Sequence, residues 1–181
     1  PKPKRLLKLW LDWLALQAAG EGREAILVCQ GQKRGSGRNA RIEEIVTCYP
    51  AVLSKDEAMK RLSVLIGLYR AGLDQPLLLT EACSGNYAKG IPDVGTEAQR
   101  EKLLKSVAKD WSGFNFNTKQ TYGDGHGQHL TRVFGNLSFE EMLEVEPLDD
   151  VDVVPRSYSW FEDLAVALWA PVYADRAGVT T

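Results

Sequence analysis

Most apolar residues in this chain recur every three or four positions, the spacing that places them on one face of an α-helix. Such patterns cover residues 5–19, 54–72, 80–89, 96–110, 128–134, 138–145 and 159–169. Only Ala25–Cys29 and Ile42–Tyr49 have the short, apolar character of strands, and they are placed to form a hairpin. Residues 73–80 are predicted to be extended. The pattern predicts the broad α/β class, of the α+β type: mostly helical, with two or three short strands that are too few for a complete independent sheet.

Local signals mark the ends of several predicted helices. Ser54 with Glu57, and Ser159 with Glu162, have the spacing of a capping box at a helix start. Gly72 is predicted to end the second long helix, and Pro171 is predicted to stop the last one. One face of the second long helix carries a set of large apolar residues: Met59, Leu62, Leu65, Ile66 and Tyr69.

Composition excludes several classes of protein. A chain of 181 residues can form one domain with a core, and no apolar run reaches the roughly 18–20 residues that span a bilayer. The formal net charge is −2, so nucleic-acid binding would need a local basic patch. Cys29, Cys48 and Cys83 form neither a disulfide framework nor a CxxC pair. Because no initiator methionine is present, we expect residues 1–181 to be a single domain excised from a larger protein.

Two groups of residues have the composition of a metal site. Asp124, His126 and His129 are three residues of the metal-ligating type within six positions, although the glycines between them are equally typical of a solvated turn. Asp93, Glu97 and Glu101 invite comparison with the Pro-Asp…(Asp/Glu)-x-Lys pattern of metal-dependent nucleases. That pattern fails on spacing here, because an arginine stands where the second acid belongs and the segment is predicted to be helical. No motif of a serine, cysteine or phosphate-binding enzyme is present.

Charge is distributed unevenly along the chain. Residues 1–41 contain nine basic and three acidic residues, and residues 139–163 contain one basic and nine acidic residues. The basic loop that includes Lys33, Arg34 and Arg38 could contact phosphates, which would make DNA affinity depend on salt. The alternative is that these charges only aid solubility. The acidic stretch would be repelled by DNA and suits a protein partner.

Four aromatic residues gather in one irregular segment: Trp111, Phe114, Phe116 and Tyr122. Aromatic side chains in a loop can stack on bases or anchor a protein interface. They can also pack as a satellite of the core under a long loop. The sequence leaves these three interpretations open.

Several motifs also follow one another in a recognisable order between residues 6 and 173. They are Leu9–Gly20, the strand Ile26–Val28, Ala58–Leu78, Trp111–Gly113, a Gly/Asp-rich turn at 123–127 with Arg132, and the helix that runs from Phe161 toward Tyr173. In this order they resemble the C-terminal domain of the gamma subunit (RecC) of exodeoxyribonuclease V, the RecBCD helicase–nuclease. The most specific stretch is Ala58–Leu78, and the turn at 123–129 departs from the family pattern, which is more acidic and lacks histidines.

The resemblance implies that the chain is a fragment of a restriction-endonuclease-like domain that has lost its metal ligands. Such a fragment would have no active site and no cofactor, whereas its parent complex is an ATP-dependent exodeoxyribonuclease and helicase that uses ATP and Mg through other subunits. The implied setting is repair of broken DNA ends in the bacterial cytoplasm. The implied partners are the alpha (RecD) and beta (RecB) subunits, with DNA contacted through the complex and no membrane.

Three functions therefore stand as alternatives. In the first, the chain is a non-catalytic assembly domain with Trp111, Phe114, Phe116 and Tyr122 as interface anchors and Lys33, Arg34 and Arg38 as a peripheral phosphate patch. In the second, it is a metal-dependent nuclease. Its metal ligands would be either Asp124, His126 and His129, or Asp93, Glu97 and Glu101. In the third, it is a sequence-neutral DNA-binding module.

Overall fold

The computed structural model describes residues 3–34, 41–115, 120–121, 123–149, 151–152 and 154–177. The chain divides into two compact units, which are described separately here. Unit 1 comprises Pro1–Ser63 and Val172–Thr181, and unit 2 comprises Val64–Pro171. The predicted organisation as a single domain stays a prediction.

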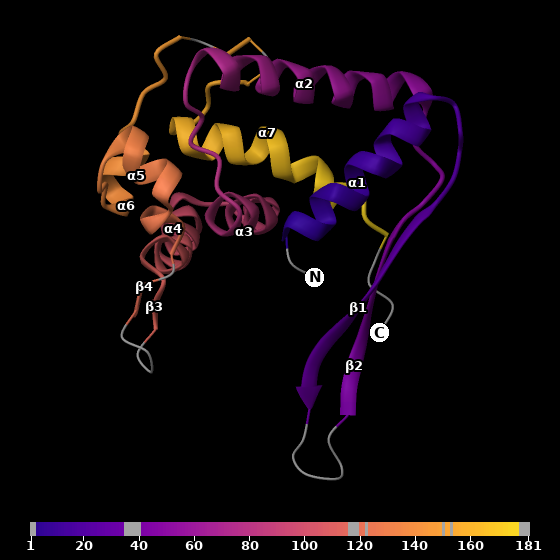
Figure 1. Cartoon of the computed structure of the whole chain (residues 1–181), viewed down its shortest axis with the longest axis horizontal. Helices are drawn as coiled ribbons and strands as arrows, with labels where there is room; N and C mark the ends of the chain where they lie inside the picture. Colours follow the sequence, from indigo (N-terminus) through magenta and orange to yellow (C-terminus); the bar gives the residue numbers. More distant parts are fainter. Residues whose placement is uncertain are drawn as a thin grey trace. The chain divides into compact units, whose positions relative to one another are not determined.

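Helices dominate the described part of the chain, as the sequence predicts (Figure 1). The helices are α1 (Pro3–Ala18), α2 (Lys55–Asp74), α3 (Ala82–Gly90), α4 (Glu97–Ser112), α5 (Gln128–Phe134), α6 (Phe139–Leu143) and α7 (Trp160–Ala174), with short 3-10 turns η2 (Ile91–Asp93) and η3 (Asp124–His126). The strands are β1 (Ala25–Arg34), β2 (Arg41–Tyr49), β3 (Phe114–Asn115) and β4 (Gln120–Thr121). Both described sheets are two-stranded and antiparallel. The α+β prediction is confirmed, whereas the restriction-endonuclease-like relationship stays a prediction.

One face of α1 is buried in unit 1. Leu6, Trp10, Trp13 and Leu14 are buried, at the three- and four-residue spacing that the sequence shows. The Trp13 ring lies 5.5 Å from the ring of Tyr49, the last residue of β2, measured between centroids. The hairpin pairs Ala25 with Tyr49 and continues in register to Gln30, where a bulge precedes Lys33.

The helix α7 runs through Pro171 and ends at Ala174, so the prediction that this proline stops the helix is wrong. A proline lacks the backbone N–H and so removes the hydrogen bond to the carbonyl oxygen four residues earlier, and only three helical residues follow this one. That last turn is held by unit 1. Buried Tyr49 donates its hydroxyl hydrogen to the carbonyl oxygen of Val172 at 3.0 Å, and the Trp10 indole donates to Asp175 Oδ2 at 2.8 Å.

The core of unit 2 draws buried side chains from α2, α3, α4, α6 and α7. They include Leu68, Tyr87, Val107, Met142, Phe161 and Leu164, and Leu78 joins them from the segment between α2 and α3. At the start of several helices of unit 2, the side chain of a nearby residue accepts a hydrogen bond from a backbone N–H group. The Thr96 hydroxyl accepts from the backbone of Gln99 at the start of α4, and Ser138 and Glu141 form a capping box on α6. Gly113 ends α4 in the left-handed conformation, with φ of 52°, which glycine adopts without steric cost.

The helix α2 runs from unit 1 into unit 2 and ends at Asp74, two residues beyond the predicted stop at Gly72. None of the described helices combines the length and the apolar composition that crossing a bilayer requires.

Candidate functional site

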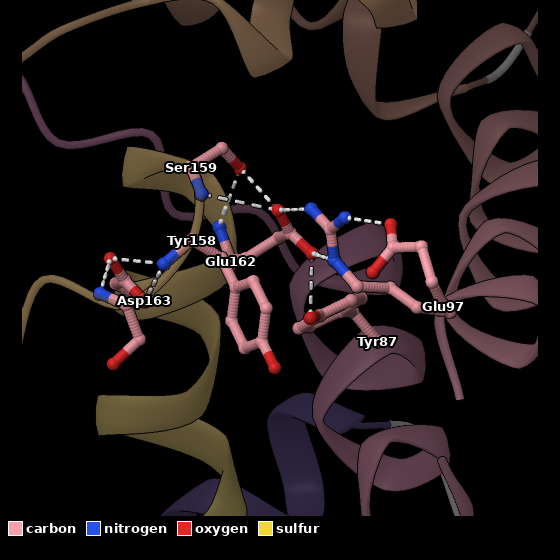
Figure 2. Close-up of polar contacts among 8 residues, drawn as sticks. Tyr87, Glu97, Tyr158, Ser159, Glu162 and Asp163 are labelled. Carbon is pink, nitrogen blue, oxygen red and sulfur yellow. Dashed lines mark hydrogen bonds and ion pairs between the residues drawn. The ribbon is translucent and has the colours of Figure 1, made fainter. Parts of the chain in front are cut away.

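A buried ion pair lies at the start of α7 and joins it to α3 and α4 (Figure 2). The Glu162 carboxylate is 0% exposed. Arg100, on α4, donates from Nε to Glu162 Oε1 at 2.8 Å and from Nη2 to Oε2 at 2.6 Å. Tyr87, on α3, donates its hydroxyl hydrogen to Oε1 at 2.7 Å. One carboxylate therefore joins α7 to two helices, α3 and α4, that lie far from it in the sequence.

The same carboxylate completes the capping box that the sequence predicts. Ser159 donates its backbone N–H to Glu162 Oε2 at 3.2 Å and its hydroxyl hydrogen to the same oxygen at 2.8 Å. Its hydroxyl oxygen accepts from the backbone of Glu162 at 3.4 Å. Beside it, Asp163 accepts from the backbone N–H groups of Ser157 at 3.0 Å and Tyr158 at 3.2 Å. Both carboxylates also suit the positive end of the α7 dipole.

Hydrogen bonds decide the charge state of this cluster. Burial by itself raises the pKa of Glu162, but the bonds from Arg100, Tyr87 and Ser159 favour the charged form more strongly, so the net pKa is lowered. Burial, and then the bond to Glu162, raise the pKa of Tyr87 well above its usual range. The bond to Glu162 also raises the pKa of Arg100. Glu162 is thus a fully bonded anion that anchors helices, and these bonds occupy the oxygens that a general base would use.

The side chain of Asp124 also has a structural role, because it caps the start of α3. Asp124 Oδ2 accepts from the backbone N–H groups of Ala82 at 2.9 Å and Cys83 at 2.8 Å, at the start of α3. The side chain of the residue that precedes α3 makes no capping bond. Asp124 therefore supplies the cap from another element, and it neutralises two backbone donors that α3 cannot satisfy internally.

The glycines on either side of Asp124 are required by contact with Trp111. A Cβ atom at Gly123 would lie 2.0 Å from the Trp111 carbonyl oxygen, and one at Gly125 would lie 2.5 Å from the indole ring. The Gly-Asp-Gly sequence thus lets the backbone approach this tryptophan while the aspartate reaches α3. This packing explains the turn without a ligand.

The two predicted acidic groups are not brought together as metal sites. His126 and His129 are both exposed, whereas Asp124 is engaged with α3. Glu97 pairs with Arg100 at 2.6 Å and Glu101 with Lys105 at 3.9 Å, while Asp93 is exposed in η2. Within the residues that the structure describes, no group of three His, Cys, Asp or Glu side chains could hold a metal ion.

We expect Asp124→Ala to lower the free energy of unfolding by about 1–2 kcal/mol, because two backbone donors of α3 lose their acceptor. Asp124→Asn keeps an acceptor oxygen and should cost less. His126→Ala, at an exposed position, serves as the control and should change the stability by less than about 0.5 kcal/mol. Urea denaturation with and without Mg²⁺ or Zn²⁺ measures these differences. Stabilisation of the native chain by either metal, lost in both Asp124→Ala and His126→Ala, would instead support the metal site.

Trp111 belongs to the core of unit 2. It is 6% exposed, its indole N–H donates to the carbonyl oxygen of Leu137 at 3.0 Å, and its ring lies 6.4 Å from that of Phe139 between centroids. Phe114 begins β3, and its side chain lies outside the described part of the structure, as do residues Phe116 and Tyr122 entirely. The role of this aromatic cluster as an interface stays a prediction.

The structure describes only part of the predicted basic patch, which consists of Lys33, Arg34 and Arg38. Lys33 and Arg34 end β1, but their side chains lie outside the described part of the chain, and so does the whole of Arg38. A contact between these three residues and phosphates stays a prediction.

Sequence reasoning missed an exposed apolar stripe on α2. Ile66, Tyr69 and Leu73 follow one another at spacings of three and four residues in unit 2, and they are 50%, 69% and 68% exposed. An apolar helix face normally packs against a core. Ile66 and Tyr69 do belong to the face that the sequence pattern groups together, but the core of unit 2 takes Leu68 from the neighbouring side of the helix. We call Ile66, Tyr69 and Leu73 the α2 stripe.

The structure thus defines a mostly helical α+β protein in which the Glu162 carboxylate is bonded within the fold and the α2 stripe is exposed. Residues 1–92 match a family model described as the RecC C-terminal domain. Because this match covers half of the chain, the chain belongs to the RecC C-terminal domain family. Membership implies that the chain is part of a RecC subunit and of a multisubunit complex. No curated protein and no solved structure matches the chain.

Proposed function

We propose that this chain is a non-catalytic assembly domain of the gamma subunit of exodeoxyribonuclease V. In this role it holds the alpha (RecD) and beta (RecB) subunits in the bacterial complex that unwinds and degrades broken DNA ends. ATP, Mg and nuclease chemistry belong to the other subunits. Contact with DNA is peripheral, through the basic loop that contains Lys33, Arg34 and Arg38.

The observation that carries this proposal is the α2 stripe. It lies within residues 1–92, the segment matched by the family model. Three large apolar side chains in consecutive turns, each at least half exposed, form the type of ridge that a partner covers with a hydrophobic groove or helix. Tyr69 is also of a residue type that is enriched among the side chains that dominate binding energy at interfaces.

Buried charges in unit 2 support the same proposal. Both Glu162 oxygens and Oδ2 of the half-buried Asp124 accept hydrogen bonds inside the unit. Burial raises the pKa of the Cys83 thiol, and the neighbouring Asp124 raises it further, so Cys83 is a poor nucleophile. These groups stabilise a rigid support for the α2 stripe.

We expect the double change Tyr69→Ser and Leu73→Ser to weaken binding of the full-length gamma subunit to at least one partner subunit. Loss of two interface anchors should cost about 2 kcal/mol or more, which is about thirtyfold in the dissociation constant. Stability should change little, because both side chains are mostly in solvent. Co-purification with the alpha and beta subunits, followed by titration calorimetry, measures the effect.

Val133→Ser is the matched control for this experiment, since Val133 is also a 54% exposed apolar residue in unit 2 but lies on α5. The control should bind as the native subunit does. Unchanged assembly of the Tyr69 and Leu73 double variant, with its fold intact, would contradict the proposed function.

A further inference from the structure

An acidic concavity lies beside the α2 stripe, in unit 2. Its volume is about 270 Å³, and Gly67, Ala71 and Asp74 of α2 line one side. Asp149, Val151 and Asp152 line another side. We call this concavity the acidic pocket. Gly67 has no Cβ atom and Ala71 only a methyl group on this wall, and the carboxylates of Asp74, Asp149 and Asp152 belong to exposed residues.

The pocket and the stripe are neighbours on the same helix. Gly67 directly follows Ile66, and Asp74 directly follows Leu73, so the stripe and the pocket adjoin at these two pairs, whose members are about 100° apart around the axis of α2. A single segment packed against the outer side of α2 can therefore contact both.

A buried glutamine holds the far wall of the pocket in place. Gln75 is 6% exposed, and its Nε2 donates to the carbonyl oxygen of Asp149 at 2.7 Å. Its Oε1 accepts from the backbone N–H groups of Leu148 at 2.8 Å and Asp149 at 3.3 Å. Because these bonds use the backbone of Asp149, its carboxylate stays available, and the backbone that presents it is anchored to the end of α2.

No ion pair joins Asp74, Asp149 or Asp152 to a described lysine or arginine. The last turn of α2 has no basic residue, and Asp74 is its final residue. A helix ends with a partial negative charge, so an aspartate there is destabilising and a cation would be stabilising.

We propose that unit 2 docks a basic amphipathic helix of a partner protein, whose apolar residues cover the α2 stripe and whose lysine or arginine side chain enters the acidic pocket. This inference rests on the proposed function as an assembly domain and adds the chemistry of the partner. The stripe requires an apolar surface, and three carboxylates require a cation. The same carboxylates repel the phosphates of nucleic acids and of anionic lipids, so a protein segment is the occupant that both features favour.

The test compares two sets of variants of the full-length gamma subunit, each titrated with the purified alpha and beta subunits at low and high salt. Asp149→Asn with Asp152→Asn removes two charges at almost constant shape. We expect about tenfold weaker binding at low salt and a smaller difference at high salt, because exposed charge pairs are screened. Tyr69→Ser with Leu73→Ser should weaken binding at both salt concentrations.

Glu140→Gln with Glu144→Gln is the matched control for charge, since both residues are exposed acids of unit 2 outside the pocket. This control should leave binding unchanged. If the serine variant loses binding and the asparagine variant binds as the native subunit does at low salt, the basic-helix inference is overturned and the proposed function stands. If neither variant loses binding, both are overturned. Equal losses in the asparagine and glutamine variants would indicate a general charge effect and would also overturn the inference.

Discussion

Replacing Arg100 with methionine is expected to lower the free energy of unfolding by about 3–5 kcal/mol, because it leaves a buried carboxylate without its cation. The Glu162 carboxylate is 0% exposed, and Arg100 supplies two of the bonds that keep it charged. Methionine keeps much of the length of the side chain, so the loss reflects the charge more than the volume. Guanidinium denaturation at pH 7 measures the change.

The same arginine offers a matched control. Arg100 also pairs with Glu97 at 2.6 Å, but the Glu97 side chain is 66% exposed. An exposed ion pair contributes little, so Glu97→Gln should cost less than about 1 kcal/mol. If Arg100→Met cost no more than Glu97→Gln, the buried pair would not be the anchor of α7.

The stability that is lost in Arg100→Met is expected to depend on pH in a definite direction. In the folded native chain the pKa of Glu162 is below its ordinary value of 4.5, so the unfolded chain binds more protons. The stability that the pair contributes is therefore present above pH 4.5 and is lost as the pH falls through the lowered folded pKa. Without Arg100, burial raises the pKa of Glu162, and the variant can bury a neutral acid. The difference in stability between the native chain and Arg100→Met should narrow as the pH falls.

Replacing Trp111 with alanine is expected to destabilise unit 2 by about 3–5 kcal/mol, the cost of removing a large aromatic side chain from a core. Trp111 is 6% exposed and donates a hydrogen bond to Leu137. Its ring also forms the surface against which Gly125 packs. Trp111→Phe keeps an aromatic ring and loses the hydrogen bond, so its cost should be intermediate. Thermal and urea unfolding of the three chains measure the order.

The Trp111→Ala variant also distinguishes a role of Trp111 in the core from a role as an interface anchor. A core residue affects assembly only through stability, so the loss of partner binding should follow the fraction of unfolded chain as the temperature rises. Val133→Ala, at an exposed apolar position, should leave stability within about 0.5 kcal/mol. If Trp111→Ala weakened assembly while unfolding at the same urea concentration as the native chain, Trp111 would be an interface anchor.

The sequence alone could determine the features that depend on neighbours in the chain. Helix spacing and capping boxes involve residues within four positions of one another, and the capping boxes at Ser138 and Ser159 need no distant partner. The hairpin of β1 and β2 follows from two apolar runs joined by one loop. The resemblance to the RecC C-terminal domain, which the family match confirms, also rests on motif order and needs no three-dimensional information.

Only the tertiary structure decided which of these local features meet. Glu162 looks like a capping residue in the sequence, but its charge is set by Arg100, 62 positions away, and by Tyr87, 75 positions away. Asp124 looks like a metal ligand, but it caps a helix that begins 42 positions earlier. Pro171 looks like a helix stop, but contacts within unit 1 hold the turn beyond it.

The α2 stripe shows that the sequence also leaves the burial of apolar residues undecided. Periodicity identifies every side of a helix that can be buried, because it depends only on spacing along one chain. Which side is covered depends on the elements that pack against it, and the core of unit 2 takes Leu68 and leaves Tyr69 exposed. The sequence thus determined the elements and the family of this protein. Packing between distant segments decided which charges are structural and which apolar surface remains open to a partner.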